Sequence, residues 1–169
     1  MNIKSVGDAV SAMMGEPEIV TMLKEDHRKV EGLFAEFESA RTSRQRKSLI
    51  DKIVTELTIH ATLEEQIVYP PIMREEEDGA KEAYEEHHVV KGLLRELTKM
   101  DGSEENVKAK VKVLSELIQH HVKEEEGELL PKLKETGEDL DMMAETVKKH
   151  KMRMLNKSKT TAVKHRKAS

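Results

Sequence analysis

The amino-acid sequence predicts an all-α protein built around an antiparallel, up-down-up-down four-helix bundle. The 169 residues include only four prolines and eight glycines, so long stretches of chain are uninterrupted. In four separate stretches, apolar residues recur at alternating steps of four and three, which is the spacing of the buried face of a packed helix. Two of these stretches also resemble the other two in sequence. This is the pattern of a duplicated helical hairpin.

The first half of the chain is predicted to hold a short helix and two long ones. Residues 1–16 form an arm whose short helix covers one end of the bundle. The first bundle helix runs from about Glu18 to Ala40. The second begins at Ser43, a plausible N-cap, and extends to about Pro70, where the Pro70-Pro71 pair should end or kink it near Tyr69.

The second half repeats this arrangement and adds a C-terminal extension. The third bundle helix runs from about Ala80, after Gly79, to Met100. Ser103 is expected to cap the fourth helix, which extends to about Pro131. The bundle therefore occupies residues 17–134. An additional helix over 135–155 and a basic, disordered tail over 156–169 follow it.

Composition excludes several classes of protein. The chain has no cysteine, so disulfides, thiolate zinc sites, Cys-ligated iron–sulfur clusters and cysteine nucleophiles are all excluded. Nowhere do 18 apolar residues follow one another, so no membrane span is predicted. The N-terminal stretch lacks the features of a signal peptide. We therefore expect a cytoplasmic protein.

Charge is distributed unevenly along the chain. Residues 1–145 contain 20 basic and 33 acidic residues, a net charge of −13, whereas the remainder contains nine basic and no acidic residues. The basic end could contact nucleic acid, an anionic membrane or an acidic partner. We interpret it instead as a solvated end that partly offsets the negative charge of residues 1–145, and we do not expect nucleic-acid binding.

Each of the four predicted helices carries one histidine on its inward face, and two of them also carry a glutamate four residues later. These residues are His27, His60, Glu64, His87, His121 and Glu125. Burying an imidazole or a carboxylate without a partner costs on the order of several kcal/mol. A metal ion satisfies both types of side chain at once.

The helical period also separates neighbouring histidines. His88 aligns with polar residues of its helix, so His87 is predicted to be the inward residue. His120 lies on a flank of its helix, so His121 is preferred there. A motif search alone could not make these two choices.

The six inward residues belong to the duplicated unit. DHRKVEGLF at 26–34 aligns with EHHVVKGLL at 86–94, and HATLEEQIVYP at 60–70 aligns with HVKEEEGELLP at 121–131. A helix rise of about 1.5 Å per residue brings the four histidines to roughly the same depth in the bundle. Two carboxylates that meet there repel each other unless cations bridge them. The sequence therefore predicts two metal ions, for which mixed N and O ligands suit iron, with manganese or zinc as substitutes.

At these residues the chain resembles the hemerythrin-like, or HHE cation-binding, family over about residues 18–134. The shared pattern is a histidine on the first helix, His-x-x-x-Glu on the second, Glu-His on the third and His-x-x-x-Glu on the fourth. The resemblance implies a hemerythrin-like bundle with a non-haem, carboxylate-bridged di-iron centre held by the six residues named above. Ferritin-like di-iron proteins need Glu-x-x-His on two helices, and only Glu85-x-x-His88 fits here.

The sequence departs from the oxygen-carrying hemerythrins that it resembles. Those proteins have a His-x-x-x-His pair on the third helix and His-x-x-x-x-Asp on the fourth. Here Lys91 stands four residues after His87, so one iron is expected to be a ligand short. Water or one of four side chains could complete its shell. These side chains are Glu65, His88, His120 and His150.

The resemblance implies a cytoplasmic protein that binds or reacts with a small ligand, O2, H2O2 or NO. Turnover, if present, would be catalase- or peroxidase-like. The missing histidine argues against reversible oxygen carriage, and the lack of cysteine argues against iron–sulfur cluster repair. An alternative is an iron- or oxygen-responsive regulatory module whose folding depends on metal. A third possibility, a metal-free helical bundle with buried histidines, is what remains if no metal binds.

Tyr69 stands five residues after Glu64 and could therefore neighbour the site and modulate its redox chemistry. We expect instead an aromatic residue at the end of the bundle, with its hydroxyl in water.

Overall fold

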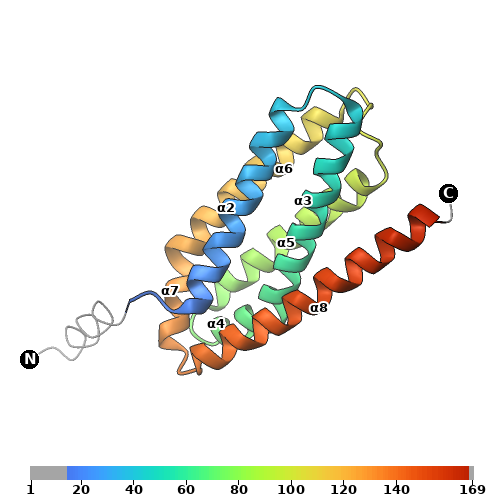
Figure 1. Ribbon diagram of the computed structural model, residues 1–169. Helices are drawn as coiled ribbons and strands as arrows, with labels where there is room; N and C mark the ends of the chain where they lie inside the picture. Colours follow the sequence, from blue (N-terminus) through green and yellow to red (C-terminus); the bar gives the residue numbers. More distant parts are fainter. Residues whose placement is uncertain (1–14, 168–169) are drawn as a thin grey trace, which may run out of the picture.

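The computed structural model describes residues 15–167, and all regular structure in that range is helical (Figure 1). Four long helices form the body of the molecule, and a fifth follows them. They are α2 (Glu18–Ser39), α3 (Ser43–Leu63), α5 (Glu77–Thr98), α6 (Val107–Glu124) and α8 (Leu140–Lys167). The all-α prediction is confirmed. The predicted short helix in residues 1–16 lies almost entirely outside the described residues.

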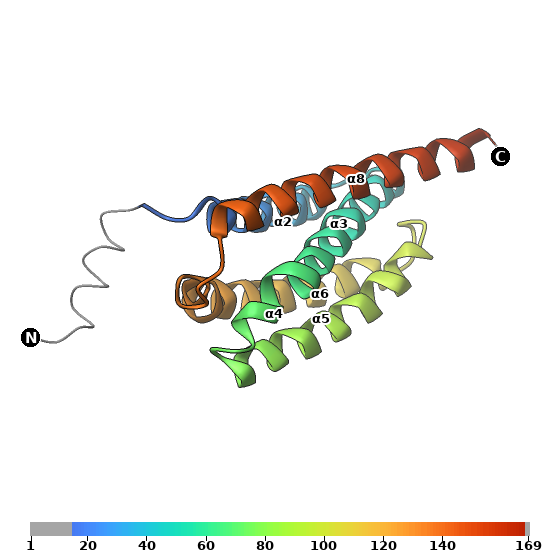
Figure 2. The ribbon, with the colours of Figure 1, turned by 90° about the horizontal axis from the view of Figure 1, so that it is seen from below.

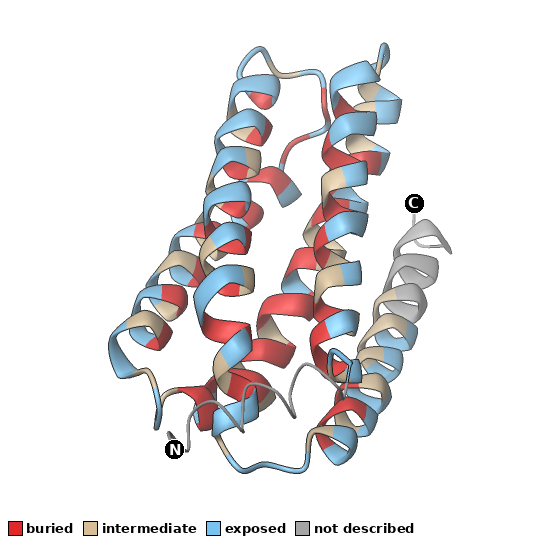
Figure 3. Cartoon of the chain, turned by 90° about the vertical axis from the view of Figure 1, so that its left-hand side faces the viewer, coloured by how far each residue is buried: buried red, intermediate tan, exposed pale blue. Residues whose placement is uncertain are grey.

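The long helices pack as a closed ring. Helix α2 contacts α3, α3 contacts α5, α5 contacts α6, and α6 contacts α2. Helix α8 lies across α2 and α3 on the outside of this ring (Figure 2). The buried faces of the helices point into the ring, and the exposed faces point outward (Figure 3). Apolar residues that recur at steps of three and four along α2, among them Leu23, Val30 and Phe34, are buried, as that spacing predicts.

Two apolar clusters fill the interior, one toward each end of the bundle. The first contains residues three positions away from each of the four inward histidines: Val30, Leu57, Val90 and Ile118. The second contains Leu23 and Ala83, each four residues before a histidine on its helix. The inward histidines therefore lie between two apolar regions, where polar groups need partners within the protein.

The expected interruption of the second helix occurs as a π-helical turn, and the fourth helix has the same feature. The turns are η1 (Glu64–Val68) and η2 (Glu125–Leu129), followed by α4 (Tyr69–Ile72) and α7 (Leu130–Lys132). Each turn starts at one of the two inward glutamates and precedes a proline. Because proline has no backbone N–H, the carbonyl four residues before it cannot be paired in the ordinary α-helical way.

Two predicted helix caps are wrong. The N-cap of α3 is Thr42, whose hydroxyl accepts a hydrogen bond from the Gln45 backbone N–H at 3.2 Å. The Gln45 side chain accepts one from the Thr42 backbone in return, at 3.1 Å, which completes a capping box. Ser103 does not cap α6, because its backbone N–H and hydroxyl donate to Asp101 in the preceding turn.

The C-terminal helix begins later and ends later than predicted. A 3-10 turn, η3 (Leu133–Glu135), precedes it, and α8 then continues to Lys167 through residues expected to form a disordered tail. No glycine or proline follows Gly137, and lysine favours helix, so nothing in the sequence ends the helix at 155. Ala144 and Val147 are buried against the bundle.

None of the helices in the described part is long and apolar enough to span a membrane.

Gly102 closes the turn between α5 and α6 against the start of α3. Its φ is +86°, and a Cβ there would lie 2.6 Å from the Ser43 carbonyl oxygen. Its own carbonyl accepts a hydrogen bond from the Arg46 guanidinium at 2.8 Å. Only glycine combines this conformation with so close a backbone approach.

Replacing Gly102 with alanine should therefore lower the free energy of unfolding by about 2–4 kcal/mol, from strain and steric overlap together. Gly137→Ala is the matched control, because Gly137 also has a positive φ of +72° but no atom within 4 Å of the added Cβ. It should cost about 1 kcal/mol. Urea denaturation measures both, and equal losses would contradict the close approach at Gly102.

Candidate metal centre

Six polar side chains from four helices meet between the two apolar clusters. All six are buried, and they are the six residues that the sequence singled out: His27, His60, Glu64, His87, His121 and Glu125. The histidines come from α2, α3, α5 and α6, and the glutamates begin the π-helical turns η1 and η2. The duplicated hairpins thus supply two imidazoles and one carboxylate each.

The four imidazoles form two close pairs. The Nε2 atoms of His27 and His60 are 3.0 Å apart, and those of His87 and His121 are 3.2 Å apart. Each pair joins the two helices of one hairpin. The Nε2 atoms therefore point toward the centre of the bundle from both sides.

The two carboxylates lie between the pairs. Glu64 Oε1 is 2.8 Å from His60 Nε2, and its other oxygen is 3.4 Å from His87 Nε2. Glu125 Oε2 is 3.1 Å from His27 Nε2 and 3.9 Å from His121 Nε2. Each glutamate therefore reaches one imidazole in each hairpin, which is the position of a bridging ligand.

The donor atoms fit a metal ion. Ligand atoms of His27, His60, Glu64 and Glu125 lie within 4.8 Å of one another, and those of Glu64, His87 and His121 form a second such group. Oε1 of Glu64 and Oε2 of Glu125 are buried and accept no hydrogen bond, although each lies against an imidazole nitrogen, Nε2 of His60 and Nε2 of His27 respectively. Carboxylate oxygens in an apolar interior are poorly solvated, and a bound cation would compensate their charge.

Four further carboxylates hold the outer sides of the imidazole rings. Glu126 lies 2.7 Å from Nδ1 of His27, and Glu86 lies 2.6 Å from Nδ1 of His121. A carboxylate that accepts a hydrogen bond from Nδ1–H fixes the ring and leaves Nε2 as the metal ligand. These outer residues were not predicted from the sequence.

The other two rings also have a carboxylate beside Nδ1, but only the one at His87 is within hydrogen-bond distance. Glu65 lies 3.1 Å from Nδ1 of His87, and Asp26 lies 3.6 Å from Nδ1 of His60. All four outer carboxylates adjoin an inward residue in the sequence, as in Asp26-His27 and Glu64-Glu65. This adjacency and the duplication, which aligns Asp26 with Glu86 and Glu65 with Glu126, were the available signals, but acidic neighbours are too common on helices for them to be specific.

Three of the outer carboxylates are themselves paired with cations. Lys91 Nζ lies 2.6 Å from each Glu65 oxygen, and Arg28 lies 2.6 Å from Glu126. Lys151 of α8 pairs with Asp26. These pairs connect the buried rings to the surface of the bundle.

Tyr69 is a correction to the sequence analysis. It is fully buried rather than at a wet end of the bundle, and its hydroxyl donates to Glu125 Oε1 at 2.9 Å. The same hydroxyl lies 3.4 Å from His121 Nε2, and the ring stacks on His87 with centroids 5.5 Å apart. The turn η1 places it there, because the extra residue of a π-helical turn shifts the later positions of the helix.

The carboxyl groups have shifted pKa values. Burial and the charge of Glu125 raise the pKa of Glu64. Burial alone would also raise the pKa of Glu125, but its contact with His27 and the charges of nearby imidazoles outweigh burial and lower it. Burial and the charges of both glutamates raise the pKa of the Tyr69 hydroxyl, so Tyr69 keeps its proton.

The imidazoles differ between the two hairpins. Burial tends to lower the pKa of His60, but the charge of Glu64 and the contact with Asp26 raise it to about 10. Burial and the charge of His121 lower the pKa of His87 to about 3. His87 is therefore neutral, the form that ligates a metal, whereas a metal at His60 would replace a proton.

Comparison with known proteins agrees with this geometry. Residues 18–133 match the Hemerythrin HHE cation binding domain. The chain belongs to this family. A DNA nickase of Nostoc sp. (strain PCC 7120) is 29% identical to this hemerythrin-like chain over 128 residues. An uncharacterized hemerythrin-like protein of Schizosaccharomyces pombe is 30% identical over 110 residues.

The chain spans only part of the length of the curated relatives that it matches. The matches cover 74% and 63% of this chain, but 36% of the Nostoc protein and 54% of the yeast protein. No solved structure matches the chain significantly. Membership of the family implies cation binding, and the grouped histidines and glutamates described above are where a cation could be held.

The four side chains that the sequence offered as additional ligands do not lie among the six inward residues. His88 and His150 are exposed. His120 is 57% exposed and lies beside Glu86 rather than among the buried imidazoles. Glu65 contacts the outer nitrogen of His87 and therefore orients that ring.

Replacing His121 with alanine should lower the amount of metal bound per chain, because His121 Nε2 faces the centre. His120→Ala is the matched control and should leave the final stoichiometry unchanged, since its ring faces outward. Elemental analysis after equilibrium with Fe(II) and gel filtration measures both. Equal losses in the two variants would contradict the placement of these neighbours.

Proposed function

We propose that the chain holds two non-haem iron ions and uses them to bind or react with O2, H2O2 or NO. The ligands would be the four inward histidines together with Glu64 and Glu125, with both carboxylates bridging. The proposal includes the antiparallel, up-down-up-down order of α2, α3, α5 and α6, in which the histidines reach one depth. Manganese or zinc could occupy the same ligands.

The observation that carries this proposal is the position of Glu64. It belongs to both groups of potential ligand atoms, one with His27 and His60 and the other with His87 and His121. A single carboxylate shared by two imidazole pairs is the arrangement that a two-metal site requires. One ion alone would leave one imidazole pair without a partner.

Bound iron would supply redox chemistry and open coordination positions for a small ligand. The chain supplies a cavity of suitable size beside the imidazoles, about 20 Å³ in volume. Besides the four histidines, its walls are mostly apolar and include Val30, Leu57, Val90 and Ile118. The cavity has room for about one water-sized molecule, so it favours a diatomic gas or peroxide over a larger substrate.

The position of Lys91 favours reaction over reversible oxygen carriage. It stands where the oxygen-carrying hemerythrins have a histidine, and it pairs with Glu65 instead of reaching the centre. Fewer protein ligands leave more coordination positions open to water and oxidant. If the centre turns over, we propose peroxide dismutation or reduction.

The apolar clusters weigh against a module that folds only with metal. Both clusters flank the centre and would hold the helices together without it.

The match to the Nostoc DNA nickase covers 36% of that protein, so it supports a shared domain rather than a shared activity.

An anaerobic Fe(II) titration of the metal-free chain tests the proposal, followed by optical spectra after adding O2 and, separately, H2O2. Two ions per chain are expected, because each imidazole pair lies in a group of potential ligand atoms that includes Glu64. We expect repeated consumption of H2O2 and oxidation by O2 that deoxygenation does not reverse. Binding of one iron per chain or fewer would contradict the proposed two-iron centre, and an oxygen-induced band that deoxygenation removes would instead indicate carriage.

Replacing Tyr69 with phenylalanine should leave two irons bound but lower the midpoint potential of the centre. The hydroxyl donates a hydrogen bond to Glu125, and removing it leaves more negative charge on that carboxylate, which stabilises oxidised iron. Tyr84→Phe is the control, because the Tyr84 hydroxyl donates to a backbone carbonyl, that of Glu65. Spectroelectrochemistry measures the shift, and equal potentials in the two variants would contradict a role for Tyr69.

A further inference from the structure

The two hairpins share their inward residues but differ on one outer face. Three polar residues of the second hairpin have apolar counterparts 61 residues earlier in the first. The pairs are His120 and Ile59, Glu124 and Leu63, and Glu128 and Ile67. The two hairpins therefore match at their inward residues but not on this face.

In the first hairpin this face is covered by α8. Ile59 and Leu63 are 4% and 1% exposed and belong to the same apolar cluster as Met143 and Val147 of α8. Helix α8 packs on α2, α3 and η1, all of which belong to the first hairpin. Helix α8 therefore covers this face of the first hairpin.

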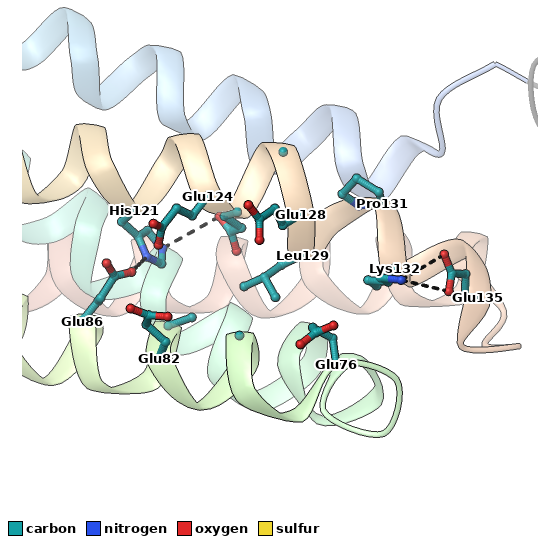
Figure 4. Close-up of a pocket in the computed structure, with 14 residues that line it drawn as sticks. Glu76, Glu82, Glu86, His121, Glu124, Glu128, Leu129, Pro131, Lys132 and Glu135 are labelled. Carbon is teal, nitrogen blue, oxygen red and sulfur yellow. Dashed lines mark hydrogen bonds and ion pairs between the residues drawn. The ribbon is translucent and has the colours of Figure 1, made fainter.

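In the second hairpin the equivalent face forms an open groove of about 420 Å³ between α5 and the segment from α6 to η3. We call this the acidic groove, because seven glutamates and a single lysine line it: Glu76, Glu82, Glu86, Glu124, Glu125, Glu128, Glu135 and Lys132. Glu82 and Glu86 of α5 lie opposite Glu124 and Glu128 (Figure 4). Lys132 lies near Glu135, so its charge does not offset the others.

The inner end of the acidic groove is the candidate metal centre itself. His121 and Glu125 are both part of its lining. Glu125 is 1% exposed, and its Oε2 has no hydrogen-bond partner. The groove therefore leads from solvent to two buried side chains of the centre, His121 and Glu125.

Glu86 links the surface of the groove to the centre. Its Oε2 lies 2.6 Å from Nδ1 of buried His121, while its Oε1 lies 3.7 Å from Nε2 of exposed His120. Glu124 Oε1 is 3.2 Å from the same His120 nitrogen. One ligand atom from each of Glu86, His120 and Glu124 can be chosen so that all three lie within 4.8 Å of one another.

We propose that the acidic groove is the route by which divalent cations reach the centre, and that Glu86, His120 and Glu124 form a transient binding site along it. The inference rests on the proposed function only in that the route ends at the proposed metal centre. Carboxylates of one sign in a groove raise the local concentration of cations and speed their association. Mixed imidazole and carboxylate ligands suit the same ions as the buried centre.

The test is the rate at which Co²⁺ binds to the metal-free, full-length chain, followed by stopped-flow absorbance. The groove variant carries Glu82→Gln, Glu124→Gln and Glu128→Gln. The control variant carries Glu36→Gln, Glu38→Gln and Glu105→Gln, which make the same change in charge at exposed positions outside the groove. Circular dichroism checks that both variants keep the helix content of the original chain.

The groove variant should bind Co²⁺ about tenfold more slowly than the control at low salt, with the difference shrinking as salt is added. Both variants should reach the same final stoichiometry, because no buried ligand is changed. His120→Ala alone should also slow binding without lowering the stoichiometry. These results would support the route and the transient site together.

Equal rates in the groove and control variants would overturn the route while leaving the proposed centre intact. A normal rate in His120→Ala would overturn the transient site. Failure of the unaltered chain to bind Co²⁺ would overturn both the route and the proposed centre. The stoichiometry and the rate thus separate failure of the inference from failure of the proposed function.

Discussion

The structure depends on the burial of two carboxylates between two apolar clusters. Glu64 and Glu125 are 0% and 1% exposed, and each keeps one oxygen without a hydrogen-bond partner. Like charges in such an interior repel strongly and are poorly solvated, so they require compensation. Four imidazoles surround them, and a pair of divalent cations would complete the compensation.

The outer carboxylates follow from the same constraint. An imidazole can present Nε2 to a cation only if its other nitrogen is held, and each hairpin supplies carboxylates for this purpose. Asp26 and Glu86 lie beside rings of their own hairpin, whereas Glu65 and Glu126 lie beside rings of the other hairpin. The outer contacts therefore connect the hairpins in both directions, and hydrogen bonds to Nδ1 orient three of the four rings.

The sequence predicted which six polar residues face inward better than it predicted the residues around them. A helical period of about 3.6 residues distinguishes His87 from His88 and His121 from His120, because burial follows the period. The period could not predict that Tyr69 points into the centre, since a π-helical turn adds a residue and rotates the side chains after it about the helix axis. The length of α8 was also missed, because charged residues without a glycine or proline are compatible with either a helix or a disordered tail.

The central claim is that two ions share Glu64, and an anomalous difference map from crystals of the iron-loaded protein tests it most directly. Two iron peaks are expected, one beside the imidazoles of His27 and His60 and one beside those of His87 and His121, with a Glu64 oxygen next to each. A single peak, or iron only at the exposed His120, would contradict the shared-carboxylate centre.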